Sequence, residues 1–90
     1  MIRHYNITVK GKVQGVFYRQ STAETARQLG INGFVRNEAN GDVYIEAEGT
    51  EEMLGKLAAW CRKGPPRAEV REVITREGPV KPFSSFEIRR

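Results

Sequence analysis

The sequence has 90 residues, which is enough for one domain with a modest hydrophobic core. Hydrophobic residues make up 39% and charged residues 29% of the chain, and the charges are dispersed, which argues against disorder. The net charge of +4 favours anionic partners without separating small phosphates from nucleic acid, and Arg89 and Arg90 add to it as a candidate solvated tail. No apolar run suggests a signal or membrane-spanning segment, so we expect a cytoplasmic protein.

The first predicted strand covers residues 4–13, where apolar and polar side chains alternate. It runs into the stretch 11–19, GKVQGVFYR, which leads to a helical pattern. A glycine-containing turn before a helix places several main-chain N–H groups at the positive end of the helix. This arrangement favours binding of an anion, above all a phosphate. Arg19 lies at this transition, and its forked guanidinium can hold two phosphoryl oxygens. The alternative is an ordinary strand–helix turn with a surface arginine.

The first predicted helix covers residues 20–29 and is followed by Gly30, which can end it in the left-handed conformation. Its start is ambiguous. A capping-box pattern at Ser21 would begin the helix at Thr22, whereas an anion-binding loop requires a start nearer Tyr18.

Two further strands are predicted over residues 33–37 and 43–47. Asn40 and Gly41 between them tolerate positive φ and form the strongest hairpin signal in the chain. Asn37 lies just before this turn, on the same strand face as the other odd-numbered residues.

The last third of the chain contains a helix and two strands. Thr50 is a suitable N-cap for a helix that residues 64–66, Gly-Pro-Pro, bring to an end. A strand follows around residues 70–74, where a β-bulge would explain the broken apolar alternation. Residues 86–88 predict a short final strand.

This order of elements predicts an α+β fold, an α/β sandwich of the ferredoxin-like split βαβ type with a short fifth strand. Right-handed crossovers would place both helices on one face of an antiparallel-rich sheet and leave the other face open to solvent. There is no repeat or linker, so we expect residues 1–90 to form a single domain.

Few side chains suit acid–base or metal chemistry. With one histidine and one cysteine, the chain cannot build a cluster of His and Cys metal ligands. His4 has no evident orienting acid, and Cys61 is expected to be a reduced thiol in the core. The carboxylates lie mostly on predicted solvated faces, and no pair suggests an acid–base dyad. The remaining candidates are the glycine-containing loop, Arg19 and Asn37.

An amide such as that of Asn37 can hold a water molecule but cannot act as a general base at neutral pH. A site built from an anion cradle, one arginine and one amide could still hydrolyse a phosphoryl compound whose leaving group departs unprotonated. Mixed anhydrides of a carboxylic acid and phosphate meet this need. Phosphoryl transfer requires mainly positioning and charge stabilisation, and the bound phosphate could itself accept the proton of the attacking water.

At these residues the sequence resembles the acylphosphatase family. The matching motifs are Gly11-x-Val13-Gln14-Gly15-Val16-x-Tyr18-Arg19 and Gly33-Phe34-Val35-Arg36-Asn37-x-x-Asn40-Gly41-x-Val43. Gly64-Pro65-Pro66-x-Ala68-x-Val70 and Phe86-x-Ile88 match the family's usual continuation. The resemblance covers nearly the whole chain, in order and without insertions.

The resemblance implies hydrolysis of small acyl phosphates to a carboxylate and inorganic phosphate, without metal or cofactor. Arg19 would bind the phosphate and Asn37 would orient the nucleophilic water. The main-chain amides of the loop would complete the cradle: Gly15, Val16, Phe17, Tyr18 and Arg19. We expect phosphate to be both product and inhibitor, and the protein to be a monomer that binds neither nucleic acid nor membrane. Tyr18 stands where the family more often has Phe, which is tolerated if its hydroxyl finds a partner.

Two alternatives remain. A small basic ferredoxin-like domain could bind RNA, and residues 33–35 resemble part of an RNA-recognition signature. Asn37 stands where that signature has an aromatic residue, and only Tyr44 is a good candidate for base stacking on the open face. The other alternative is a phosphate-binding domain without turnover, against which the intact pair of Arg19 and Asn37 argues.

Overall fold

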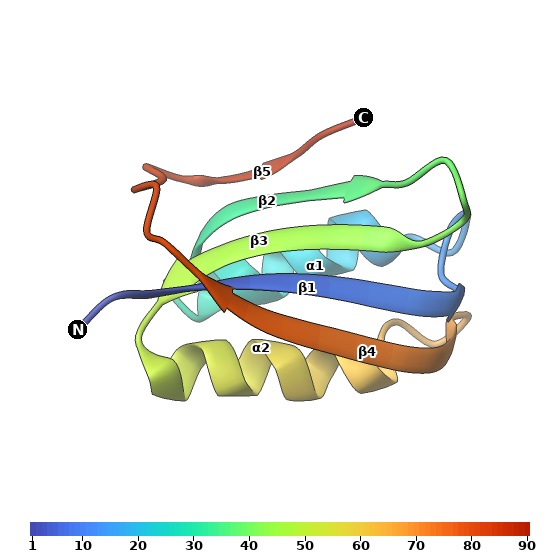
Figure 1. Ribbon diagram of the computed structural model, residues 1–90. Helices are drawn as coiled ribbons and strands as arrows, with labels where there is room; N and C mark the ends of the chain where they lie inside the picture. Colours follow the sequence, from blue (N-terminus) through green and yellow to red (C-terminus); the bar gives the residue numbers. More distant parts are fainter.

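The computed structural model describes all residues from 1 to 90. Its elements, in chain order, are β1 (Arg3–Lys12), α1 (Tyr18–Gln28), β2 (Asn32–Asn37), β3 (Val43–Gly49), α2 (Glu51–Lys63), β4 (Glu69–Gly78) and β5 (Phe86–Ile88). The strands form one sheet in the order β4-β1-β3-β2-β5, and only the pair β2 and β5 is parallel. Both helices cover the same face of the sheet (Figure 1). The predicted βαββαβ order, the short fifth strand and the two-layer sandwich are confirmed.

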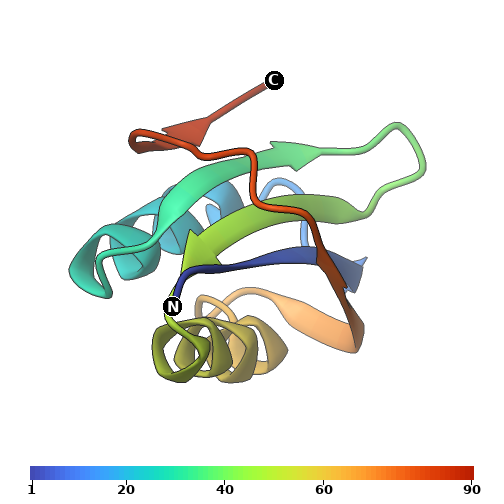
Figure 2. The ribbon, with the colours of Figure 1, turned by 60° about the vertical axis from the view of Figure 1, so that its left-hand side comes forward.

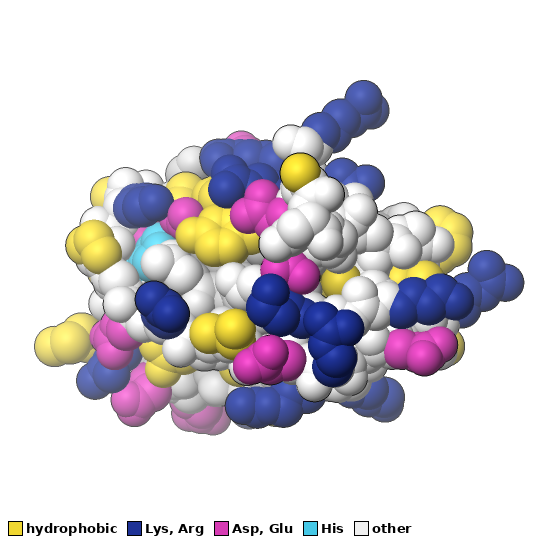
Figure 3. Space-filling model, turned by 45° about the vertical axis from the view of Figure 1, so that its right-hand side comes forward, with side chains coloured by type: hydrophobic (Ala, Val, Ile, Leu, Met, Phe, Trp, Pro, Cys, Tyr) yellow, Lys and Arg dark blue, Asp and Glu magenta, His cyan; other side chains and the backbone are white.

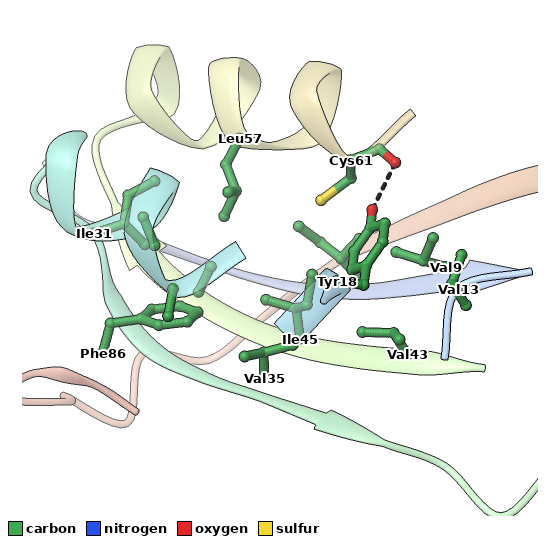
Figure 4. Packing of buried hydrophobic residues seen from close by; sticks show 14 of the residues in the cluster. Val9, Val13, Tyr18, Ile31, Val35, Val43, Ile45, Leu57, Cys61 and Phe86 are labelled. Atoms are coloured by element: carbon green, nitrogen blue, oxygen red, sulfur yellow. Dashed lines mark hydrogen bonds between the residues drawn. The ribbon is translucent and has the colours of Figure 1, made fainter. Parts of the chain in front are cut away.

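The hydrophobic core lies between the sheet and the helices (Figure 4). Ile7 of β1 and Val35 of β2 both pair with Ile45 of β3, and all three side chains are fully buried. The helices add small residues from α1 and larger ones from α2, namely Ala23, Ala26, Leu54, Leu57 and Cys61. Packing in this core holds the strands in place, including the strand ends beside which the candidate site lies. Neither helix is long and apolar enough to cross a membrane.

Helix α1 begins at Tyr18, which settles the ambiguity in favour of the early start. The capping box is wrong, because the N–H of Ser21 donates to the Phe17 carbonyl as in a helix interior. Gly30 has φ 71° after the helix, as predicted. In α2 the predicted cap is confirmed, since the side chain of Thr50 accepts from the N–H of Met53.

The turn between β2 and β3 lies where the Asn-Gly signal and the two flanking strands predicted it. Asn37 ends β2 and Val43 begins β3, so five residues connect them. Only Gly41 has positive φ, while the Asn40 side chain accepts from the N–H of Asp42 at 3.0 Å. This side-chain bond stabilises the turn.

The irregular alternation in β4 is a β-bulge, as predicted. Gly11 of β1 pairs with Val70 and Lys10 pairs with Glu72, which leaves Arg71 without a partner across the ladder. A side chain at Gly11 would collide with the main chain of β4, so only glycine fits here.

The second face of the sheet is not open as expected, because the segment 79–85 crosses it between β4 and β5 (Figure 2). Glu48 of β3 accepts hydrogen bonds from the main-chain N–H groups of Lys81 and Phe83 at 2.6 and 2.8 Å. His4 Nδ1 lies 2.7 Å from the same carboxylate, so His4 has an orienting acid after all. Both side chains are buried under the crossing segment, which the strand pattern could not reveal.

The aromatic residues on this second face also differ from expectation. Phe34 lies beside both Tyr44 and Phe83, with its ring centroid 6.0 Å from that of Tyr44 and 5.8 Å from that of Phe83. The guanidinium carbon of Arg89 lies 4.1 Å from the Phe34 ring centroid, and Phe34 is buried. Tyr44 is therefore not the only aromatic side chain here, but the rings pack against each other and against arginine. Arg89 is not a solvated tail.

Candidate active site

The site lies where β1 runs into α1, next to the end of β2 (Figure 1). A pocket of about 390 Å³ opens there, lined by Val13, Gly15, Phe17, Tyr18, Arg19, Gln20, Asn37 and Ile88. The candidates from the loop, from α1 and from β2 therefore meet in one pocket, although Asn37 is far from the others in sequence. Val16 is the exception, because its side chain is in the core and only its main chain remains available.

The loop before α1 carries a run of free main-chain donors. None of the N–H groups from Gly15 to Gln20 donates a hydrogen bond within the protein. No side chain caps the start of α1, and its first turn contains no acidic residue. The positive end of the helix is thus uncompensated, and these donors are available to an anion.

The loop backbone is curled by positive φ values of 73° at Gly15 and 64° at Phe17. Phe17 is the only residue other than glycine with positive φ, a conformation that a bulky side chain rarely adopts. Such strained positions cluster at functional sites, where the surrounding structure holds them in place.

Arg19 is held at the pocket by the C-terminal end of the chain. Its Nη1 donates to the main-chain carbonyl of Arg89 at 3.1 Å. Arg89 in turn is tied to the sheet, because its N–H donates to the Val35 carbonyl at 2.8 Å. Since this is the only hydrogen bond that the Arg19 side chain makes within the protein, most of its guanidinium N–H groups remain free for a ligand.

Asn37 is the last residue of β2 and lines the pocket, as its strand face predicted. Its Oδ1 is the only buried side-chain oxygen or nitrogen atom without a hydrogen-bond partner in the protein. Buried polar atoms are nearly always paired, so this acceptor is available to a molecule in the pocket.

Gln14 connects the two halves of the site, and the sequence did not reveal this role. Its Nε2 donates to the main-chain carbonyls of Glu38 at 2.8 Å and Asp42 at 2.9 Å. Gln14 directly precedes Gly15, and Glu38 directly follows Asn37. The Gln14 side chain therefore ties the loop before α1 to the turn that follows Asn37. Gln14 was visible as part of the sequence motif, but only the tertiary structure shows its hydrogen-bond partners.

Tyr18 anchors the start of α1 to the end of α2. Its hydroxyl donates to the main-chain carbonyl of Cys61 at 2.6 Å (Figure 4), so the buried hydroxyl has the partner it needs. Burial, together with this contact, raises the pKa of Tyr18 well above its ordinary value. A Cβ at Gly64 would press against the ring, so glycine makes room for it.

The pocket contains no side chain suited to proton transfer. Its lining includes no His, Asp or Glu, and Arg19 is its only charged group. Tyr18 stays protonated because burial raises its pKa. What the pocket offers is a set of donors for an anion, one fixed positive charge and one free amide oxygen.

Comparison with known proteins identifies the family of the chain. The acylphosphatase family model matches residues 5–88. The acylphosphatase of Marinobacter nauticus is 48% identical over 86 residues, which cover 94% of each chain. Among solved structures, an acylphosphatase from Coxiella burnetii superimposes with a TM-score of 0.95 at 39% identity, covering 98% of this chain and 93% of that one. Acylphosphatase from Bacillus subtilis gives a TM-score of 0.95 at 31% identity over the full length of both chains. The chain belongs to the acylphosphatase family.

Proposed function

We propose that the protein hydrolyses the carboxyl–phosphate anhydride bond of small acyl phosphates, with Arg19 binding the phosphoryl group and Asn37 orienting the attacking water. The observation that carries this proposal is the meeting of a free N–H run, a fixed guanidinium and an unpartnered amide oxygen in one pocket. Membership of the acylphosphatase family supports the same reaction.

The phosphoryl group is held by main-chain donors and one cation. The N–H groups of Gly15, Val16, Phe17, Tyr18 and Arg19 donate to its oxygens, and the Arg19 guanidinium neutralises part of its charge. These donors are already oriented before the substrate binds, so they stabilise the charge of the transition state without reorganisation.

The attacking water is oriented by Asn37. Its Oδ1 accepts one hydrogen of the water and leaves the water lone pair directed at phosphorus. The water oxygen bonds to phosphorus as the bond from phosphorus to the acyl oxygen breaks, and the electron pair of that bond leaves with the carboxylate. The proton lost by the water passes to a phosphoryl oxygen, so the products are a carboxylate and inorganic phosphate.

This mechanism needs a good leaving group, because no residue of the pocket can protonate it. A carboxylate is a weak base, because its conjugate acid has a pKa of about 4, and it therefore departs without a proton. An alkoxide leaving group from a phosphate monoester would require one. The protein should therefore release phosphate from acetyl phosphate and hardly at all from a simple alkyl phosphate.

A direct experiment combines this substrate pair with the variant Asn37→Ala. Turnover of acetyl phosphate should be lost, while competitive inhibition by inorganic phosphate of the residual activity should persist, since the amide is assigned to water. Loss of phosphate binding together with turnover would move Asn37 into the cradle. Comparable rates on acyl phosphate and monoester would overturn the proposal as a whole.

The chain on its own supplies every residue of the pocket, and we infer that a monomer is the active form. The RNA-binding alternative is not favoured, because Phe34 is buried beneath Arg89 and offers no open ring. Acidic and basic side chains are also interspersed over the face shown in Figure 3, without a continuous basic track. The substrate assay distinguishes the enzyme from a domain that binds phosphate without turnover.

A further inference from the structure

We propose that Asn40 is a modification site, at which the folded protein deamidates spontaneously to aspartate and isoaspartate, and that isoaspartate there loosens the turn beside the active site. The modification itself is independent of the proposed function. Only its effect on turnover rests on that function.

The reaction needs an asparagine that is followed by a glycine. The main-chain nitrogen of the glycine bonds to the side-chain carbonyl carbon of the asparagine. The amide nitrogen leaves as ammonia with the proton of the attacking N–H, and a five-membered succinimide remains. Water then opens this ring at one of its two carbonyls. One opening gives aspartate, and the other gives isoaspartate, in which the main chain runs through the former side chain. Glycine favours the attack because it has no Cβ to obstruct it.

The chain contains two such pairs, Asn32-Gly33 and residues 40–41, and the first is protected by the sheet. It begins β2, which lies between β3 and β5. Gly33 is buried, and its N–H donates to the Ser85 carbonyl at 2.8 Å. The Asn32 side chain donates to the Phe83 carbonyl at 3.2 Å. Ring closure at this pair therefore requires the sheet to open.

The second pair lies in the connection between β2 and β3, which projects from the end of the sheet (Figure 2). Asn40 is exposed, and the space around a Cβ at Gly41 would be open, so a ring can form here without a collision. The Gly41 N–H donates to the Glu38 carbonyl at 3.1 Å, and this bond has to break before the nitrogen attacks. A single bond in an exposed turn opens without unfolding of the domain.

The Asn40 side chain is already oriented for the reaction. Its Oδ1 accepts from the N–H of Asp42 at 3.0 Å, which folds the side chain back over the peptide bond between Asn40 and Gly41. The same N–H stabilises the negative charge that develops on Oδ1 during the attack. One turn thus brings together the nucleophilic nitrogen, the carbonyl carbon and a donor for its oxygen.

Isoaspartate would disturb the part of the turn that holds the site together. The carbonyls of Glu38 and Asp42 both accept from Gln14, and the Glu38 N–H donates to the Asp42 carbonyl at 2.8 Å. Isoaspartate adds one carbon to the main chain between these two anchors. The turn that follows Asn37 then no longer fits the Gln14 side chain.

Aspartate, the other product, should have a smaller effect. It keeps the length of the main chain and replaces only the Asn40 amide, whose Nδ2 donates to Asp42 Oδ2 at 3.2 Å. The two carboxylates would repel each other, but Lys10 Nζ lies 2.8 Å from Asp42 Oδ2 and offsets part of this repulsion. The variant Asn40→Asp reproduces this product alone.

The test is peptide mapping by mass spectrometry of protein incubated at mildly alkaline pH, both native and unfolded in urea. Enzymatic methylation of isoaspartate distinguishes the two products. We expect Asn40 to deamidate at least about tenfold faster than Asn32 in the native protein, because opening a paired strand costs more than about 1.4 kcal/mol. In urea the two rates should converge. If Asn40 is as slow as Asn32 in the native protein and both react in urea, the hydrogen bonds of the turn protect it and the proposal is overturned.

Turnover of acetyl phosphate measures the consequence. The kcat of the incubated wild type should fall in proportion to its isoaspartate content, while the inhibition constant of inorganic phosphate stays the same. Asn40→Ser, incubated in parallel, should keep its initial kcat, since serine cannot form the succinimide but can accept from the Asp42 N–H. Full kcat in protein that carries isoaspartate at this position would overturn the effect on the turn. A fresh protein that does not hydrolyse acetyl phosphate would overturn the proposed function, and the peptide map would still decide the modification.

Discussion

The hydroxyl of Tyr18 donates a 2.6 Å hydrogen bond to the main-chain carbonyl of Cys61 and so joins the first turn of α1 to the last turn of α2. The Cys61 carbonyl is among the last four of its helix, which lack partners within the helix. Tyr18 thus satisfies a buried acceptor and holds the start of α1, where the donor loop ends. Its ring also packs on Trp60, with centroids 5.4 Å apart.

Replacing Tyr18 by Phe should therefore destabilise the protein. The variant keeps the ring but leaves the Cys61 carbonyl buried without a donor, which costs about 1–3 kcal/mol. Equilibrium unfolding in urea measures the loss. Tyr44→Phe is the control, because Tyr44 is half-exposed and its partner Glu46 keeps a hydrogen bond from Lys81. Equal effects of the two substitutions would contradict the anchoring role of Tyr18.

Gln14→Ala should affect turnover more than phosphate binding. Without the two hydrogen bonds to Glu38 and Asp42, the turn that follows Asn37 can move relative to the donor loop. A misplacement of about 1 Å can cost about 100-fold in rate, so we expect kcat to fall by about tenfold to 100-fold. The inhibition constant of inorganic phosphate should change by less than about threefold.

The matched control for Gln14 is Gln28→Ala, on the exposed face of α1, which should leave both quantities unchanged. If Gln14→Ala instead weakens phosphate inhibition in parallel with kcat, then Gln14 maintains the phosphate-binding loop itself. It would not then act by setting the position of Asn37 relative to that loop.

Glu48 should make the protein sensitive to acid. Burial acts to raise the pKa of this carboxyl, but hydrogen bonds from Lys81, Phe83 and His4 outweigh burial and hold the pKa below its ordinary value. A group with a lowered pKa in the folded state stabilises the protein above its unfolded pKa and loses that contribution as pH falls. The free energy of unfolding should therefore decrease below about pH 4.5.

Urea unfolding between pH 7 and pH 3 tests this dependence. Glu48→Gln should be less stable than the wild type at pH 7, and the difference should shrink as the pH falls. Glu24→Gln, exposed on α1, should follow the wild-type curve. If the free energy of unfolding of Glu48→Gln falls with pH in parallel with that of the wild type, the Glu48 carboxyl is not responsible for the loss of stability in acid.

Cys61 should be unreactive in the folded protein. It is fully buried, and burial raises the pKa of its thiol to about 12. Because the thiolate is the reactive form, alkylation by iodoacetamide at pH 8 should proceed only through unfolding. The rate should rise with urea in step with the unfolded fraction. Rapid stoichiometric labelling of the native protein would place this thiol at the surface.

Much of the fold could be predicted from local patterns. Alternation in β1, the Thr50 cap and the Gly-Pro-Pro end of α2 each act over a few residues, so the sequence alone reveals them. The bulge at Arg71 was also visible as a break in alternation. The presence of Arg19 and Asn37 in one pocket followed from the predicted order of the elements, because this order places the end of β2 beside the start of α1.

The features that were missed depend on contacts distant in sequence. His4 and Glu48 are 44 residues apart and are buried only because the segment 79–85 crosses the sheet. Gln14 finds its partners 24 and 28 residues away, and Arg19 finds the Arg89 carbonyl 70 residues away. No periodicity encodes such pairs. The start of α1 stayed open between Tyr18 and Thr22 in the sequence, because the loop backbone, curled at Phe17, decides it.

The most direct test of the site is the variant Arg19→Gln, measured with acetyl phosphate as substrate and inorganic phosphate as inhibitor. Loss of a preorganised donor costs about 10²–10³ in rate, and this substitution also removes the only charge of the pocket, so kcat/KM should fall by at least that factor. Inhibition by phosphate should disappear with it. A purified, folded variant that keeps more than roughly a tenth of the wild-type kcat/KM, a difference of about 1.4 kcal/mol, would contradict the assignment of Arg19 as the phosphate-binding cation.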